Sequence, residues 1–164
     1  MASSTKEGAA PAATPRATGG EPTPLILDNA GLKIALDDVL TELACVTNHI
    51  ELSPDVSTTT LTTMCGETDY PGVTKWSLVA TLYQSFDPGF TEEVLSAAVD
   101  GGVPVAFEVI GRRDTVVSAT NPKWSGEVIP KAYAPINGDA GDVSTIDLEW
   151  SVVGAPVKSI VPGP

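Results

Sequence analysis

Residues 123–154, KWSGEVIPKAYAPINGDAGDVSTIDLEWSVVG, place two alternating segments on either side of a loop rich in glycine and aspartate. In the second segment, apolar residues fall on one side of the chain and polar residues on the other: Ile146, Leu148, Trp150 and Val152 against Thr145, Asp147, Glu149 and Ser151. A period of two is typical of a strand with one buried and one solvated face. The pattern therefore predicts a half-buried antiparallel strand, apolar inward and acidic outward.

The same period recurs along the chain and predicts a mainly β protein. We expect strands over residues 32–36, 39–52, 56–65, 73–86, 103–112, 123–136, 143–153 and 157–161. Turn-forming residues separate them, notably at 53–55, 67–72 and 137–142. Between Phe90 and Val99 the period becomes helical, with Thr91 as the expected N-cap and residues 100–102 as the stop. The expected fold is a β-sandwich or distorted barrel with one packed helix at about residues 91–100.

Residues 1–24 differ in composition from the rest of the chain. They contain six Ala, four Pro, three Gly and six Ser or Thr, and no large apolar residue beyond Met1. Such a segment cannot offset the entropy cost of ordering, so we expect a flexible N-terminal arm. We expect a single domain over residues 25–164. No apolar run follows Lys6, and none of 18 residues occurs elsewhere, so neither a secretory signal nor a membrane span is expected.

The net charge of −12 falls entirely on residues 25–164, because the charges of the arm cancel. The acids are scattered, which predicts a folded acidic surface that repels nucleic acid rather than binding it. Cys45 and Cys65 are too few for a disulfide framework. We expect two small buried thiols in a reducing cytoplasm.

Catalytic and metal-binding patterns are sparse, so we expect no enzyme, no cofactor and no metal site. His49 is the only histidine, and with Glu51 and Cys45 close in sequence it is expected to be solvated or at an interface. The loop NGDAGD lacks the remainder of a calcium loop. The adjacent acids at 37–38 and 92–93 point apart, and neither makes an acid–base pair alone. Of the tryptophans, Trp76 and Trp150 are expected in the core and Trp124 at an interface.

Several stretches together resemble the major tail protein, the tail tube subunit, of long-tailed (siphovirus-type) bacteriophages that infect actinobacteria. They are WSGEVIPKAYAPI (124–136), the loop through Asp142, TIDLEWSVVG (145–154) followed by Pro156, and VTKWSLVATLYQSFDPG (73–89) followed by a short helix. Residues 43–54 resemble the family as well, as a strand that ends at a proline before a threonine-rich stretch. The resemblance covers roughly residues 25–160. It implies the phage tail tube fold, a place in the virion tail after assembly in the host bacterial cytoplasm, and rings, typically hexameric, that stack head to tail around a lumen.

The resemblance also implies partners and contacts. The partners are copies of the chain itself, other tail proteins such as the tape measure and terminator proteins, and double-stranded genomic DNA that passes without specific binding; no membrane is involved. The expected inter-subunit elements are the arm, residues 53–72 and the 137–142 loop. The candidate contact residues are Pro11, Pro15, Pro22, Pro54, Tyr70, Trp124, Asn137, Asp139 and Asp142.

Physical reasoning favours the same assignment. A ring closes sheet edges that would otherwise pair without control, and head-to-tail contacts propagate a filament. An acidic wall suits the passage of DNA, so we expect Glu51, Asp147 and Glu149 to contribute to the lumen. The arm is expected to be mobile in the free subunit and ordered in the tube. The alternatives are a capsid decoration or head–tail joining protein, then a carbohydrate-binding β-sandwich, and more distantly an enzyme.

Overall fold

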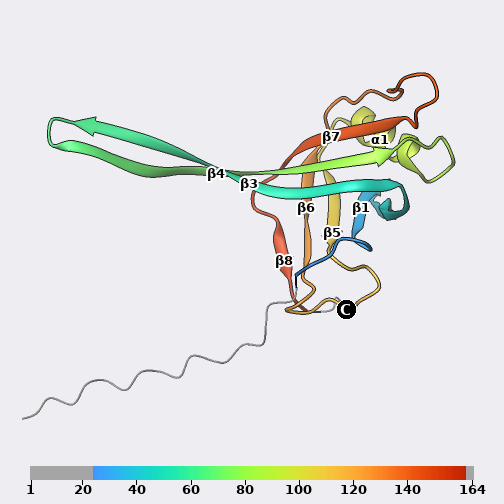
Figure 1. Ribbon diagram of the computed structural model, residues 1–164, viewed down its shortest axis with the longest axis horizontal. Coiled ribbons are helices and arrows are strands. Elements are labelled where there is room, and N and C mark those ends of the chain that lie inside the picture. The colour runs from blue at the N-terminus through green and yellow to red at the C-terminus, as the bar shows by residue number, and fades with distance from the viewer. Residues whose placement is uncertain (1–23, 162–164) are drawn as a thin grey trace, which may run out of the picture.

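The computed structural model describes residues 24–161, which form one bent, eight-stranded antiparallel sheet with a single α-helix (Figure 1). The strand order is β2-β1-β5-β6-β7-β4-β3, and β8 pairs with β6 beside this path. The elements are β1 (Gly31–Leu36), β2 (Val39–Glu42), the 3-10 turn η1 (Ala44–Val46), β3 (Thr47–Thr63), β4 (Gly66–Tyr83), α1 (Thr91–Gly101), β5 (Val105–Ile110), β6 (Lys123–Ile129), β7 (Thr145–Val152) and β8 (Val157–Ser159). The predicted mainly β fold with one helix is confirmed.

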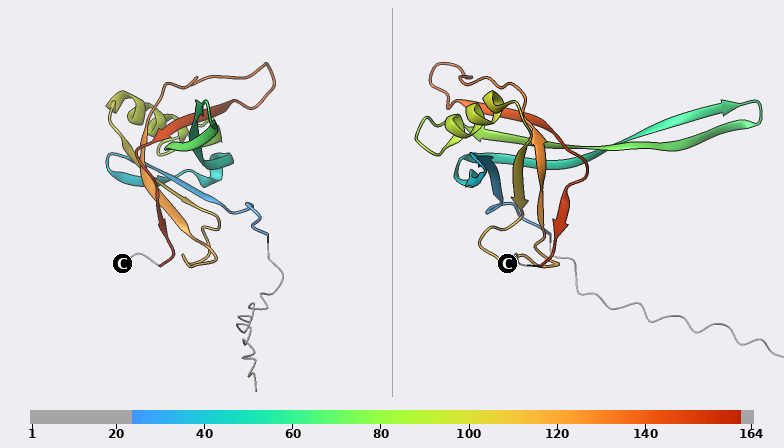
Figure 2. Two further views of the ribbon diagram at one scale, coloured as in Figure 1. Left: turned by 90° about the vertical axis from the view of Figure 1, so that its left-hand side faces the viewer. Right: turned by 180° about the vertical axis from the view of Figure 1, so that it is seen from behind.

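The sheet bends into two layers that enclose the core. Strands β3, β4 and β7 run across β1, β5, β6 and β8 (Figures 1 and 2). The corner lies between β6 and β7, which share only two residue pairs, Val128 with Val152 and Ile129 with Ser151. The predicted alternation along β7 is confirmed, because its apolar side chains are buried while Asp147 and Glu149 are exposed. Its buried side chains meet those of the crossing layer: Leu32, Ile34 and Phe107.

Helix α1 covers one end of the two layers with Val94, Leu95 and Ala98. The predicted stop is confirmed, since Gly102 takes the left-handed conformation (φ 62°). The predicted N-cap is wrong. Phe90 holds that position, and Thr91 is a buried first residue whose hydroxyl donates to the Tyr83 carbonyl oxygen at 2.8 Å. Thr91 therefore ties the helix to the end of β4 instead of capping it.

The turn between β1 and β2 holds two non-glycine residues at positive φ, Asp37 (49°) and Asp38 (64°). Two-residue hairpin turns of this kind favour glycine at the second position, because a Cβ there is strained. We expect Asp38→Gly to raise the free energy of unfolding by about 0.5–1 kcal/mol, after the added entropy of the unfolded chain is deducted. Urea denaturation measures the change. Asp38→Ala is the control: it removes the carboxylate but keeps the Cβ, so it should not raise the free energy of unfolding. A glycine variant less stable than the original chain would contradict the argument.

Strand β3 and strand β4 form one long hairpin where the sequence predicts a break at residues 53–55 and a loop at 67–72. Both predictions are wrong. Pro54 is tolerated because β3 is an edge strand. No strand pairs with its outer side among the described residues, so the missing N–H of proline costs no hydrogen bond there. Pro71 pairs with Thr58 beside a register shift between Val56 and Thr58, another place that accepts proline. Proline thus marks an irregular edge here rather than the end of a strand.

Smaller departures have local causes. The strand predicted over 123–136 ends at Ile129, directly before Pro130, and the one over 39–52 is divided by η1. The prediction of buried cysteines is wrong, since Cys45 and Cys65 are both exposed. Each lies in a turn at one end of β3, and the Cys45 sulfur accepts a hydrogen bond from Arg113 Nη1 at 3.6 Å. Within residues 24–161, no helix has both the length and the apolar character needed to cross a lipid bilayer.

Candidate assembly surfaces

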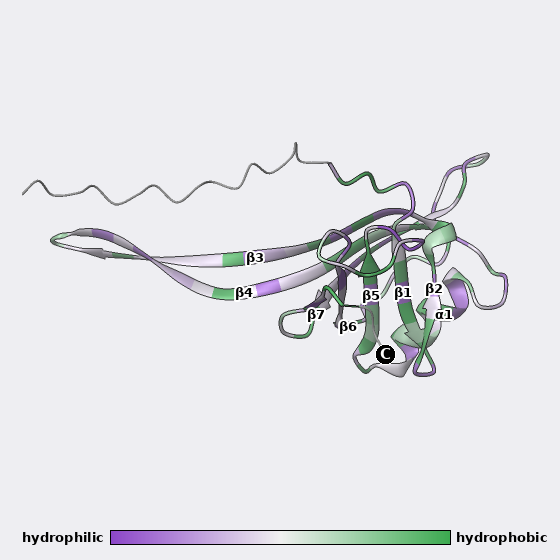
Figure 3. Cartoon of the chain, turned by 90° about the horizontal axis from the view of Figure 1, so that it is seen from below, coloured by the Kyte–Doolittle hydropathy of each residue, from purple (hydrophilic) through white to green (hydrophobic). Residues whose placement is uncertain are grey.

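The outer part of the β3–β4 hairpin, residues 54–75, projects far beyond the two-layer body (Figures 1 and 3). Every residue in this projecting hairpin is exposed. Fixing the backbone costs about 1–2 kcal/mol per residue, whereas a net hydrogen bond returns only about 0.5–1.5 kcal/mol and fixes two residues. An isolated two-stranded hairpin is therefore marginal at best. The projecting hairpin needs a partner to hold its shape.

The two faces of the projecting hairpin differ in chemistry. On one face, the hydroxyl of Thr60 donates to Asp69 Oδ1 at 2.6 Å and that of Thr62 to Glu67 Oε1 at 3.3 Å. On the other face, the register makes Leu61 and Tyr70 diagonal neighbours. Both are about half exposed, at 51% and 53%. Tyr70, a predicted contact residue, therefore stands on the less polar face, which is the better suited to a protein partner.

The layer formed by β3, β4 and β7 has two unpaired edges. The outer edge of β3 has no neighbouring strand among the described residues. On the far side of the layer, β7 pairs with β6 only through Ser151 and Val152, so its remaining length is open in the described part of the chain. Long unpaired edges are templates for further strand pairing. One subunit thus offers two edges that another copy can extend.

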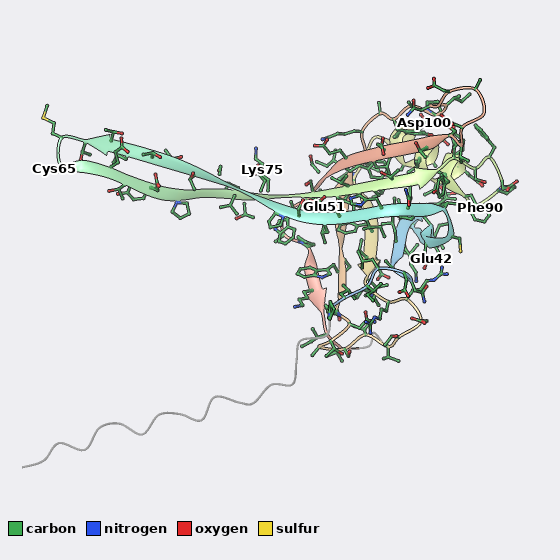
Figure 4. All side chains as sticks on the ribbon, in the orientation of Figure 1. Glu42, Glu51, Cys65, Lys75, Phe90 and Asp100 are labelled. Carbon is green, nitrogen blue, oxygen red and sulfur yellow. The ribbon has the colours of Figure 1, made fainter. Side chains whose placement is uncertain are left out.

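The outward surface of this layer is acidic, and it unites residues far apart in the sequence. The register places Glu51, Val79 and Glu149 in one cross-strand row, and His49, Thr81 and Asp147 in the next. The Thr81 hydroxyl donates to Asp147 Oδ1 at 2.7 Å, and His49 Nε2 lies 3.8 Å from Glu51 Oε2. The register therefore brings the three predicted lumen acids, Glu51, Asp147 and Glu149, onto one exposed surface, called the acidic face below. Figure 4 labels Glu51 on this layer.

Basic residues are concentrated away from the acidic face. Of the seven in residues 25–164, six lie on strands of the crossing layer or within three residues of their ends: Lys33, Arg112, Arg113, Lys123, Lys131 and Lys158. There Lys33 pairs in register with Glu42 and Glu108, and Lys123 Nζ contacts Glu108 Oε1 at 2.5 Å. On the hairpin side, Lys75 stands opposite Asp55. The negative charge of the acidic face is therefore left largely uncompensated.

The loop between β6 and β7 passes over α1 and presents three predicted contact residues (Figure 2). Its base is fixed, because Gln84 Nε2 donates to the Pro135 carbonyl oxygen at 2.6 Å and Tyr133 donates to Glu92 Oε2 at 3.2 Å. Burial and the neighbouring Glu92 carboxylate raise the pKa of Tyr133 to about 12, so its phenol stays protonated, and remains a donor, beyond the pH at which an ordinary tyrosine ionises. The three predicted residues that lie beyond this base are exposed: Asn137, Asp139 and Asp142.

An apolar cavity of about 310 Å³ lies at the root of the projecting hairpin. The rings of Trp76 and Trp124 border it, with centroids 6.0 Å apart and planes tilted by 37°. Trp76 is only partly buried and packs against the core from its edge, so its predicted core position is confirmed only in part. Trp150 is fully buried, as predicted. Pro54 lines the same cavity. We call this cavity the tryptophan groove. No contiguous sequence pattern predicts it, because its walls come from five separate segments of the chain.

Asn121 holds the rim of the tryptophan groove and was not singled out by the sequence. Its side chain is 4% exposed, accepts from the Arg112 N–H at 3.1 Å, and donates to the carbonyl oxygens of Arg112 and Thr115 at 2.9 Å each. We expect Asn121→Ala to lower the free energy of unfolding by about 1–3 kcal/mol, because three part-buried hydrogen bonds to the backbone are lost. Denaturant unfolding measures it. Thr120→Ala, at the exposed neighbour, is the control, and equal small losses in both variants would contradict this role.

The predicted contacts Pro11, Pro15 and Pro22 lie outside the described residues. Within residues 24–161, no group of three or more His, Cys, Asp or Glu side chains is placed to hold a metal ion.

Comparison with solved structures shows which proteins share this architecture. A chain from the tail of an empty gene transfer agent particle, refined with helical and C6 symmetry, matches with a TM-score of 0.60 at 14% identity, over 79% of this chain and 94% of that one. A sheath/tube terminator of an extracellular contractile injection system in its extended state matches with a TM-score of 0.60 at 12% identity, over 85% and 99%. A chain from the virion of a native gene transfer agent matches at 0.56 and 16% identity, over 78% and 95%.

No protein family model and no curated protein sequence matches the chain. The similarity is therefore one of three-dimensional structure, spread over nearly the whole length of each neighbour. Taken with the bent antiparallel sheet and its packed helix, it shows that the chain has the tail tube fold of phage-like particles.

Proposed function

We propose that this chain is a structural subunit of a tail tube, and specifically the major tail protein of a siphovirus-type actinobacteriophage. Copies assemble into rings that stack head to tail in the virion tail. The single observation that carries the proposal is the projecting hairpin, whose 54–75 segment is exposed throughout and lacks a partner within the described subunit. The tail origin of the structural neighbours supports it.

Ring formation uses the free edges of the β3–β4–β7 layer. Pairing β3 of one subunit with the open edge of the next extends the sheet without any change of fold, as in other cases of strand addition. A closed ring leaves no edge exposed. Six copies per ring is the number we propose, and the C6 symmetry of the gene transfer agent tail supports it.

Stacking uses the projecting hairpin. With about 3.3 Å of rise per residue, ten residues in each arm of the hairpin reach about 33 Å past the body, far enough to overlap a neighbouring ring. Such a contact joins two different surfaces and therefore propagates along an axis. We place Pro54 and Tyr70 in this contact, with Asn137, Asp139 and Asp142 of the β6–β7 loop at a further inter-subunit surface.

The acidic face lines the lumen in this proposal. Its exposed carboxylates, Glu51, Asp147 and Glu149, repel phosphates and let double-stranded genomic DNA pass without specific binding. The role is structural and needs neither a cofactor nor a membrane. The further partners are the tape measure and terminator proteins of the same tail, and assembly takes place in the host bacterial cytoplasm.

Negative-stain electron microscopy of the purified chain, taken through a concentration series, tests the proposal. We expect long hollow cylinders of uniform width to form above a threshold concentration, because a head-to-tail contact must nucleate before it extends. A particle that remains a monomer throughout the series would remove the proposal.

A second candidate is a terminator, a joining protein that closes a tail tube. The match to a sheath/tube terminator, covering 99% of that chain, favours it specifically. The microscopy separates the two, because a terminator forms single rings or caps the ends of existing tubes, whereas a tube subunit polymerises.

A further inference from the structure

We propose that the tryptophan groove of one subunit binds the N-terminal arm of a neighbouring subunit, through the uncharged stretch of residues 8–15. The inference rests on the proposed function, because it requires neighbouring copies.

The groove is apolar in a strongly acidic protein. None of the residues that line it carries a charge, although the chain has a net charge of −12. Trp76 and Trp124 offer ring surface on one side, and Ile50, Leu52 and Pro54 continue the wall from β3. Large apolar hollows on a soluble subunit mark binding surfaces. A charged or strongly polar segment would lose hydration there without gaining a partner, so the occupant must be apolar and uncharged.

The described chain begins at the rim of this groove. Leu25 and Leu27 form part of its lining, together with Ala30. A Cβ added to Gly111 would lie 3.1 Å from Leu25 Cδ2, so the bare backbone of Gly111 is what lets Leu25 sit this close. The first described residues therefore form one wall of the groove, and the preceding 23 residues of the sequence connect to the chain at that wall.

The sequence before Leu25 favours binding of the arm to the groove of a neighbouring subunit rather than to the groove of its own subunit. In EPTP (21–24), two prolines fix φ and push the residues before them to extended conformations. A sequence of this kind disfavours an immediate reversal into the groove whose wall Leu25 and Leu27 form. At about 3.1 Å per residue, 23 extended residues reach up to about 70 Å, enough to span to an adjacent subunit.

Residues 8–15, GAAPAATP, match what the groove requires. They carry no charge, their side chains are small, and Pro11 and Pro15 favour the polyproline conformation. Proline-rich segments in that conformation bind grooves lined by aromatic rings and give up little conformational entropy on binding. The stretches on either side, by contrast, carry Lys6, Glu7, Arg16 and Glu21. Binding of Pro11 and Pro15 against the two tryptophan rings would thus bring three predicted contact residues, Pro11, Pro15 and Trp124, into one interface.

Cysteine cross-linking between differently tagged full-length chains tests the proposal. In a Cys45→Ser/Cys65→Ser background, one chain carries Ala12→Cys and the other Thr120→Cys at the groove rim. After mild oxidation we expect at least about tenfold more mixed dimer than with Asp87→Cys, an exposed position away from the groove, in place of Thr120→Cys, because a bound arm raises the local thiol concentration. Ala10→Glu/Ala13→Glu added to the chain that carries Ala12→Cys should remove this excess, whereas Thr5→Glu/Thr18→Glu in the same chain, which adds equal charge outside the stretch, should leave it unchanged.

Each outcome is decisive. Mixed dimers no more abundant than the control overturn the inference, and if those samples still form tubes, the proposed function survives. A further sample uses chains that carry both Ala12→Cys and Thr120→Cys; cross-links confined within single chains there show that the arm folds back on its own groove, which also overturns the inference. Mixed dimers without any tubes support arm exchange and count against the tail tube role.

Discussion

Removing the projecting hairpin should abolish tube formation and leave the subunit folded. In the variant, residues 56–74 are replaced by Asn-Gly, which joins Asp55 to Lys75, two residues that already face each other across the strands. No residue of the deleted segment is buried, and every core side chain lies elsewhere. We therefore expect an intact core and a loss of cylinders by electron microscopy at concentrations where the original chain forms them.

The control for this variant is Met64→Ser/Cys65→Ser, which alters the tip but keeps the length of the hairpin. Met64 is fully exposed and Cys65 is exposed as well, so the two substitutions should leave the fold and stability of the subunit unchanged. Near-ultraviolet circular dichroism, which reports on the buried Trp150, checks the fold of both variants. Normal tubes from the shortened chain would show that the hairpin is not the stacking element.

Reversing the charge of the acidic face should impede the passage of DNA. Glu51→Lys, Asp147→Lys and Glu149→Lys together put three ammonium groups per subunit on one surface, within adjoining cross-strand rows. Lysine–phosphate contacts release counterions and bind DNA without regard to sequence, so many copies along a tube act together. We expect ejection of DNA from variant particles to slow by at least about tenfold at low salt, and to recover as the salt concentration rises.

The matched control carries Asp87→Lys, Asp100→Lys and Asp114→Lys, three exposed acids outside the acidic face, and therefore has the same net charge. Ejection timed by DNA-dye fluorescence compares the two. If both variants eject alike, at either the normal or a reduced rate, the acidic face is not the lumen.

Much of the fold could be predicted from the sequence, because alternation reports directly on a half-buried sheet. The residues of β7 illustrate it: the side chains of Ile146, Leu148 and Trp150 turn inward, and those of Asp147 and Glu149 turn outward, as the period requires. The helix was likewise visible in its change of period and its glycine stop. These signals are local, so each can be found in a single stretch of chain.

The projecting hairpin could not be predicted, because its stability does not come from its own sequence pattern. Half of residues 56–65 are threonine, the segment lacks a buried face, and prolines such as Pro54 and Pro71 normally end strands. The acids of the acidic face could be named from the sequence, but their contact with one another could not, and the tryptophan groove could not be predicted at all. Glu51 and Glu149, like Trp76 and Trp124, come together only through the pairing register and the bend of the sheet. Separations along the sequence contain no information about either.

Hydrogen–deuterium exchange of residues 54–75, compared between assembled and dissociated chains, is the decisive measurement. If the projecting hairpin is held by neighbouring copies, its backbone amides must be protected from exchange only when those copies are present. In the dissociated chain we expect these amides to exchange almost as fast as in an unstructured peptide, while the amides of β7 stay protected. In the assembled form we expect the hairpin amides to become as slow as those of β7. Rapid exchange of residues 54–75 in both states, or slow exchange in an isolated monomer, would contradict the account.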